Sequence, residues 1–262
     1  ARREVLWAGV PSLQAARRLL LHSDEALGPA LEGFEVIPQA SLERVIDFLP
    51  GARAPLAGNH GWHVLIEAVA DSSGGDALPG RCEAMLAAAF ERGLVEDAVI
   101  AANDTQAEAF WLLRESIAAS ERANGIAVQH DISVPVDRMP DFVDFAVPAI
   151  EAGWPGVGAV AFGHLGDGNV HFHVIAPAGV ERASWEASTG KTISARIYDL
   201  VTEWGGAISA EHGIGQAKRD EFARLGDPVA LGMLRAVKQA LDPGGLLNPG
   251  KVLQLAPDAI RP

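Results

Sequence analysis

The chain is poor in cysteine and in basic residues. Among its 262 residues Cys82 is the one cysteine, and 21 Lys and Arg stand against 34 Asp and Glu, a net charge of -13. A single cysteine excludes an internal disulfide and a thiolate metal cluster, and we therefore expect a reducing, cytoplasmic location. The negative charge argues against nucleic acid and anionic membranes as partners, while small acidic substrates need only a local basic pocket.

Two further kinds of segment are missing from the sequence. No apolar run approaches the roughly 20 residues that a membrane helix needs, so we expect no integral membrane segment. No Gly-rich stretch matches a dinucleotide fingerprint or a P-loop. The chain is therefore not expected to hold an ADP-bearing cofactor through a known loop of its own.

The order of the predicted elements favours an α+β fold. Apolar patterning predicts strands over 4–10, 34–37, 62–70, 96–102, 127–136 and 207–210, and helices over 12–27, 41–49, 81–92, 105–124, 140–152 and 184–204, with helical residues on to 241. Capping-box patterns, SLER at Ser41 and TQAE at Thr105, open two of the helices. We expect a ferredoxin-like antiparallel sheet with helices packed on one face, plus a C-terminal helical segment.

The segment 161–174, AFGHLGDGNVHFHV, reads as two strands around a tight turn. If residues 166–169, GDGN, form the loop, His164 lies directly opposite His171, with Cβ atoms about 4.5–5.5 Å apart. His173 is two residues beyond His171 and points to the same face. A lone histidine on an apolar face is commonly a hydrogen-bonded core residue, but two facing imidazoles and a third in phase predict a divalent metal site.

A second polar segment, SAEHGIGQ at 209–216, follows the predicted strand 207–210. Glu211 is the natural third ligand for the two facing histidines, and a set without thiolates suits zinc, manganese or iron. His212 would then be free as a general base. A strand-end ion pair between Glu211 and His212 is an equally good interpretation of this spacing.

Arg114, in the helical stretch FWLLRE, is a candidate for binding a carboxylate. Its planar guanidinium suits bidentate contact if it points into a cavity, and a solvated or paired arginine is the alternative. In the strand 127–136, Gln129, Asp131 and Ser133 share one face, and we interpret His130 as structural.

Five motifs, FWLLRE, HDISVP, GHLGDGNVH, SAEHGIGQAKR and LDPGGLLNPGK, occur in an order that resembles a known family. Residues 1–262 are similar to the C-terminal substrate- and metal-binding domain of FAD-linked D-2-hydroxyacid dehydrogenases, which include D-2-hydroxyglutarate and D-lactate dehydrogenases and the glycolate oxidase flavoprotein subunit. The resemblance implies that FAD is held mainly by a separate N-terminal domain, which we expect this chain to lack. It also implies that the full-length protein oxidises a D-2-hydroxy acid to a 2-oxo acid and passes electrons to an acceptor that the sequence does not identify. A homodimer is a further expectation.

The resemblance also assigns roles to single residues. The implied metal, zinc or manganese, is bound by His164, His171 and Glu211, and His212 takes the substrate hydroxyl proton. Further implied roles are substrate-carboxylate binding by Arg114 and proximity to the flavin domain for Asn248.

Three positions depart from the family members that oxidise dicarboxylates. Ala118 stands where a threonine contacts the distal carboxylate, Gln129 where a lysine does, and His173 where many relatives have asparagine. Gln129 and His173 remain candidate substrate contacts. Losing a charge-assisted bond costs about 1.5–3 kcal/mol, which favours a monocarboxylate or an unusual hydroxy acid over a 2-hydroxyglutarate-like substrate.

Two other functions fit the same chemistry. Two histidines and a carboxylate also form the facial triad of non-haem iron oxygenases, although the usual jelly-roll scaffold of these enzymes is richer in strands. A stand-alone module with a structural metal is the third hypothesis. Under the leading hypothesis, the 262-residue chain alone is colourless and inactive.

Overall fold

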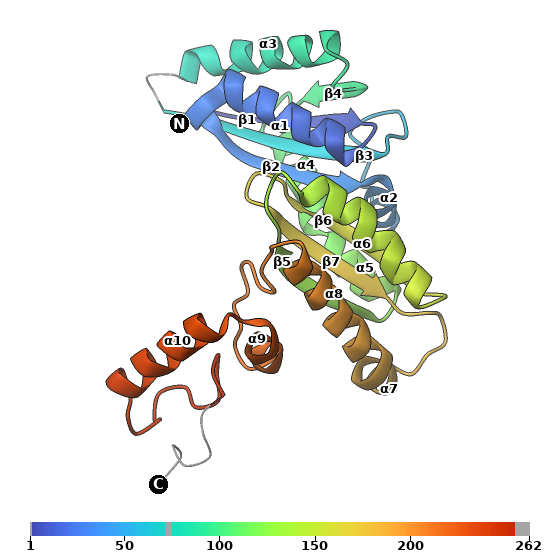
Figure 1. Ribbon diagram of the computed structural model, residues 1–262. Coiled ribbons are helices and arrows are strands. Elements are labelled where there is room, and N and C mark those ends of the chain that lie inside the picture. The colour runs from blue at the N-terminus through green and yellow to red at the C-terminus, as the bar shows by residue number, and fades with distance from the viewer. Residues whose placement is uncertain (1, 72–74, 255–262) are drawn as a thin grey trace.

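The computed structural model describes residues 2–71 and 75–254, and Figure 1 shows their arrangement. An antiparallel sheet in the order β4-β1-β3-β2-β6-β7-β5 forms the centre of this described part. Its strands are β1 Arg2–Val10, β2 Leu31–Pro38, β3 Trp62–Ala70, β4 Asp97–Ile100, β5 Ala127–Ser133, β6 Gly158–His164 and β7 Asn169–Ile175. The expected α+β class with an antiparallel sheet is confirmed.

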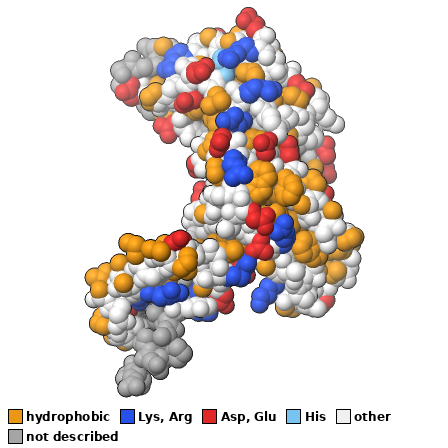
Figure 2. All heavy atoms as spheres, viewed as in Figure 1, with side chains coloured by type: hydrophobic (Ala, Val, Ile, Leu, Met, Phe, Trp, Pro, Cys, Tyr) orange, Lys and Arg blue, Asp and Glu red, His pale blue; other side chains and the backbone are white. Residues whose placement is uncertain are grey.

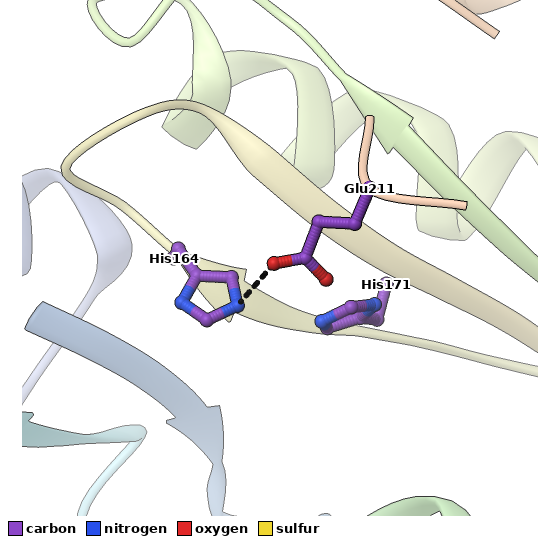
Figure 3. A group of neighbouring side chains, drawn as sticks. All are labelled: His164, His171 and Glu211. Atoms are coloured by element: carbon purple, nitrogen blue, oxygen red, sulfur yellow. Dashed lines mark ion pairs between the residues drawn. The ribbon is translucent and has the colours of Figure 1, made fainter. Parts of the chain in front are cut away.

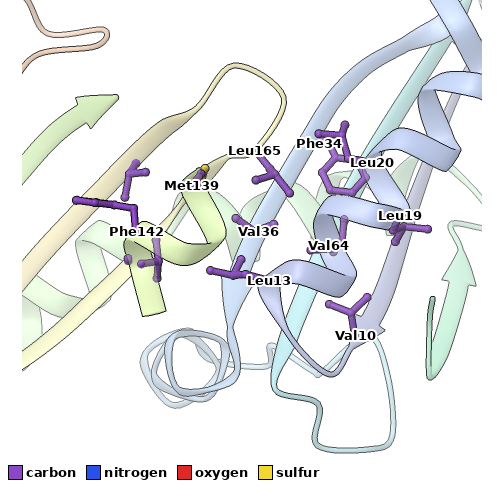
Figure 4. Close-up of a cluster of buried hydrophobic side chains, with 14 of the residues drawn as sticks. Val10, Leu13, Leu19, Leu20, Phe34, Val36, Val64, Met139, Phe142 and Leu165 are labelled. Atoms are coloured by element: carbon purple, nitrogen blue, oxygen red, sulfur yellow. The ribbon is translucent and has the colours of Figure 1, made fainter. Parts of the chain in front are cut away.

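Helices cover both faces of this sheet rather than one. They are α1 Leu13–Leu27, α2 Gln39–Phe48, α3 Leu78–Glu91, α4 Asp104–Glu115, α5 Ile117–Asn124, α6 Met139–Gly153, α7 Arg182–Trp185, α8 Lys191–Glu203, α9 Arg219–Leu225 and α10 Pro228–Leu241. The larger core lies under α1, α3, α6 and α8, and Figure 4 shows part of it. A smaller core lies under α2, α4 and α5. Strand β1 explains both layers, because Leu6 and Ala8 enter the first core while Val5 and Trp7 enter the second.

Several helix boundaries differ from the sequence-based predictions. Ser12 caps α1 as the pattern predicts, but α4 is capped by Asn103, whose Oδ1 accepts from the Gln106 N–H at 3.0 Å. The predicted helix 105–124 is interrupted at Ser116, between α4 and α5. The SLER capping box is wrong, because α2 starts two residues before Ser41 and leaves that side chain buried inside the helix.

The C-terminal part also differs from expectation. The predicted strand 207–210 is reduced to one bridge between Ser133 and Ala207, and a short π-helix over Glu186–Gly190 joins α7 to α8. Helices α9 and α10 project from the sheet as a separate lobe, at the lower left of Figure 1. No helix in the described part of the chain is long and apolar enough to cross a membrane.

One face of α10 is apolar and exposed. Val229, Met233, Val237 and Leu241 recur every four residues and expose between 56% and 79% of their surface. Leu246 and Leu247, just beyond the helix, are exposed as well. Figure 2 shows hydrophobic side chains gathered on this lobe.

Candidate metal centre

The β6–β7 hairpin carries the predicted histidines, with a register two residues away from the expected one. His164 pairs with Asn169, and His171 pairs with Phe162. The turn includes Leu165 because its N–H donates to the Phe34 carbonyl at 3.1 Å and its side chain is fully buried. A shift of two residues leaves every side chain on its original face. The two imidazoles are therefore diagonal neighbours, with ring centroids 5.7 Å apart.

Close backbone approaches explain two glycines of this hairpin. Gly163 has φ +147°, and a Cβ there would lie 2.3 Å from the Asn169 carbonyl oxygen. Gly168 has φ +76°, and its added Cβ would meet the Val134 carbonyl oxygen at 2.0 Å. Asp167 accepts a hydrogen bond from the Asn169 N–H at 3.0 Å, so it has the local turn role that the sequence suggested.

His164, His171 and Glu211 come together as predicted. Each offers a ligand atom, and these atoms lie within 4.8 Å of one another. Figure 3 shows the Glu211 carboxylate between the two rings, with Oε1 3.5 Å from His164 Nε2. Two imidazoles and one carboxylate form a donor set that suits zinc or manganese. The residues present therefore fit a divalent cation.

Asp131 anchors the loop that brings Glu211 to the hairpin. Its Oδ2 accepts the backbone N–H groups of Ala210 at 3.2 Å and of Glu211 and His212 at 2.8 Å each. Burial raises the pKa of this carboxyl, but the bonds from His212 and Glu211 outweigh burial and hold the pKa below its usual range. The sequence placed Asp131 on the correct face without revealing this contact.

Glu35, on β2, is a site residue that the sequence analysis missed. Its Oε1 lies 2.6 Å from His164 Nδ1, and its Oε2 accepts from Arg114 Nε at 2.8 Å. The bond to Glu35 raises the pKa of His164. Burial raises the pKa of Glu35 itself, but His164 and Arg114 together bring it below the usual value. The only signal in the sequence was an acidic residue inside an apolar strand.

The two imidazoles of the pair have opposite pKa shifts. Burial, reinforced by the Arg114 charge, lowers the pKa of His171 to about 4. A neutral imidazole is the form that binds a metal, so His171 is ready to act as a ligand at neutral pH. His164 is oriented by the carboxylate at its Nδ1 and presents Nε2 towards Glu211.

The other predicted site residues surround this centre at different distances. Arg114 extends over the Phe162 ring, with Cζ 5.1 Å from the ring centroid. His212 is 70% exposed, on the loop that Asp131 holds. Asn248 is exposed, follows α10 in the chain and lines a cavity together with Lys238 of that helix rather than with the three histidine and glutamate residues.

His173 and Gln129 form a neighbouring pair on β7 and β5. They face each other in register, and Gln129 is exposed and accepts from Arg122 Nη1 at 3.4 Å. His173 is buried and directs Nδ1 at the carboxylate of Glu121, which is fully buried. His130 bonds the Phe172 carbonyl and the Ser194 hydroxyl, as its predicted structural role requires.

Comparison with known proteins identifies the family to which the chain belongs. The family model described as "FAD linked oxidases, C-terminal domain" matches residues 1–252. The chain belongs to this family. The description links the family to FAD and names the matching region as its C-terminal domain.

Similar curated proteins are D-2-hydroxyglutarate dehydrogenases. The mitochondrial enzyme of Arabidopsis thaliana is 32% identical over 241 residues, which cover 91% of this chain and 41% of that protein. The enzyme of Xanthomonas citri pv. viticola is 34% identical over 224 residues, covering 86% of this chain and 46% of that protein. The chain thus spans less than half the length of these relatives.

Solved structures with the same fold are more distant in sequence. A p-cresol methylhydroxylase with substrate bound has a TM-score of 0.63 at 11% identity, covering 95% of this chain and 52% of that one. An alkyldihydroxyacetonephosphate synthase has a TM-score of 0.56 at 12% identity, covering 94% of this chain and 44% of that one. At these identities the likeness shows the fold alone.

Proposed function

We propose that this chain is the substrate- and metal-binding part of an FAD-dependent dehydrogenase that oxidises a D-2-hydroxy acid to a 2-oxo acid. The observation that carries the proposal is the convergence of His164, His171 and Glu211, with ligand atoms within 4.8 Å, beside Arg114. The names of two similar relatives support the same reaction class. Membership in an FAD-linked family favours this function over a non-haem iron oxygenase or a structural-metal module.

Each residue of the site has a separate task in this reaction. A bound zinc or manganese ion would supply Lewis-acid chemistry that lowers the pKa of the substrate hydroxyl, and FAD would supply the hydride acceptor. Arg114 keeps its Nη edge for the substrate carboxylate, because Glu35 takes only Nε. His212 accepts the hydroxyl proton from a loop that Asp131 fixes through backbone bonds.

The exposed face of α10 supports an interaction with the N-terminal FAD-binding domain. Four large apolar side chains there, Val229, Met233, Val237 and Leu241, are exposed in the described chain. Exposed apolar faces of this kind are typical of interfaces. Asn248 follows α10 and is proposed to lie near that interface. A homodimer and the expected cytoplasmic location stay predictions, and the Arabidopsis relative is named as mitochondrial.

Gln129 and His173 are the residues proposed to contact the part of the substrate that is distant from the proposed metal. Nδ1 of His173 already contacts the Glu121 carboxylate, and Gln129 could contact a substrate only through an uncharged amide. These two residues still favour a short monocarboxylate or an unusual hydroxy acid as substrate. Turnover of D-2-hydroxyglutarate must therefore be compared directly with turnover of a monocarboxylate.

The test assays the full-length protein with an artificial electron acceptor against D- and L-2-hydroxy acids, with D-lactate and D-2-hydroxyglutarate among them. We expect turnover of D-enantiomers, loss of turnover after chelation, and recovery with zinc or manganese. Full turnover by a protein shown to be free of metal would overturn the metal assignment. Absence of turnover with every D-2-hydroxy acid would overturn the reaction class.

A further inference from the structure

Glu35 lies at the seam where the two halves of the sheet meet. The β2–β6 ladder consists of two residue pairs, Glu35 with His164 and Val36 with Gly163. The Glu35 side chain points to the face that carries the metal centre, and only 1% of the residue is exposed. A carboxylate buried this deeply is costly to remove from water unless both oxygens are bonded.

The two oxygens of Glu35 serve two different parts of the proposed site. Oε1 contacts Nδ1 of His164, a proposed metal ligand, and Oε2 accepts from Nε of Arg114, which is proposed to bind the substrate carboxylate. His164 comes from β6 and Arg114 from α4, and the two residues are 50 positions apart in the chain. One buried carboxylate therefore joins side chains with separate functions.

These contacts with Glu35 determine which nitrogen atoms of His164 and Arg114 remain available for other ligands. With Nδ1 bonded to Glu35, His164 can offer only Nε2 as a ligand, and Nε2 lies 3.5 Å from Glu211 Oε1. With Nε bonded, Arg114 keeps its two Nη groups, and its guanidinium stays over the Phe162 ring. The Phe162 ring in turn lies 5.1 Å from the ring of His171, measured between centroids.

We propose that Glu35 is a positioning residue that couples the metal ligand His164 to the carboxylate-binding Arg114. It fixes which nitrogen of His164 can bind metal and which edge of Arg114 meets the substrate. The inference rests on the proposed function of the site. Its consequence is that one substitution weakens metal binding and substrate binding together, because each depends on the same carboxylate.

Glu35→Gln in the full-length protein tests this coupling. The amide oxygen can accept from one partner, but the NH2 group then faces the N–H donor of the other. We expect zinc affinity, measured by competition with a chromogenic chelator, to fall about 10- to 100-fold. At saturating zinc we expect KM for the hydroxy acid to rise more than kcat falls, because Arg114 is misplaced.

Glu67→Gln is the matched control. Glu67, on the neighbouring strand β3, also accepts from an arginine Nε and a ring N–H, those of Arg3 and Trp111, at 2.8 and 2.7 Å. It lies outside the metal centre, so this variant is expected to keep wild-type zinc affinity and KM. A loss of both in Glu67→Gln equal to that in Glu35→Gln would show a general packing effect and refute the positioning role.

Two further measurements distinguish the possible failures. In ¹⁵N-histidine NMR spectra we expect wild-type His164 to carry a proton on Nδ1, and Glu35→Gln to lose this preference.

Wild-type protein that binds no zinc refutes the proposed metal site. Wild-type zinc affinity and KM in folded Glu35→Gln refute the Glu35 role alone. If Glu35→Gln does not fold, Glu35→Asp keeps the charge but shortens the reach, and the same two losses are expected of it.

Discussion

Removing the charge of Asp131 is expected to destabilise the loop that carries Glu211 and His212. In Asp131→Asn the side-chain oxygen can still accept the three backbone N–H groups that now lie 2.8 to 3.2 Å from Oδ2. Hydrogen bonds to a charged acceptor contribute about 1.5–3 kcal/mol and neutral ones about 0.5–1.5 kcal/mol, so each bond loses about 1 kcal/mol. We expect the free energy of unfolding to fall by about 2–3 kcal/mol.

The second consequence concerns the metal. The bond from the Glu211 backbone N–H to Asp131 helps to hold the Glu211 side chain beside His164. Residues that orient a metal ligand typically change metal affinity 10- to 100-fold when they are altered, and we expect zinc affinity in Asp131→Asn to fall by a factor in that range. Urea unfolding without metal and chelator competition with zinc measure the two effects separately.

Glu181→Gln provides the comparison for this variant. Glu181 also accepts two backbone N–H groups, those of Ala183 and Ser184, but it is exposed at the start of α7. This variant should be destabilised much less than Asp131→Asn and keep its zinc affinity. The reasoning is refuted if Asp131→Asn unfolds within about 0.5 kcal/mol of wild type, which is the usual range for surface substitutions.

Four other outcomes are expected. His171→Ala in the full-length protein should lose metal and most turnover while keeping its fold by circular dichroism; unchanged metal content would contradict the site. Gly163→Ala should be strongly destabilised, because its Cβ would lie 2.3 Å from a backbone oxygen, whereas Gly158→Ala on the same strand meets nothing within 4 Å and should unfold like wild type. Burial lowers the pKa of His63 to about 4 in the folded protein, so between pH 6.5 and 4 the unfolded chain binds a proton there and the folded protein does not. The free energy of unfolding should therefore fall by about 3 kcal/mol as the pH drops from 6.5 towards 4. A His63 ring that titrates near 6.5 by NMR would disprove this. The 262-residue chain alone should be colourless and inactive, and tight stoichiometric FAD binding to it would refute that expectation.

The predicted distal substrate contacts show how far residue types alone can lead. Gln129 and His173 are neighbours in the sheet, as their positions in the two strands allowed. No local pattern pairs His173 with Glu121, which lies 52 positions away on α5. The sequence shows directly that Gln129 carries no charge. It does not show which residue forms a hydrogen bond with the His173 side chain.

The hydrophobic pattern of the sequence was enough to determine the common face of the hairpin histidines. Side chains alternate with period two along a strand, so His164, His171 and His173 share a face in either of two registers that differ by two residues. The actual register depended on Leu165, whose burial against β2 is a tertiary contact. The alternating pattern alone could not decide between the two registers, which differ by two residues.

The sequence by itself determined the residue types of the proposed metal centre, the strands that carry two of its proposed ligands and the family whose motifs they form. Only the tertiary structure decided that Glu35 holds His164 and Arg114, and that Asp131 holds the loop of Glu211. The physical reason is range. Alternation and capping act over a few neighbouring residues, whereas these carboxylates meet partners 79 to 129 positions away, in contacts created by the pairing of β2 with β6 and by the fold of the C-terminal loop onto β5.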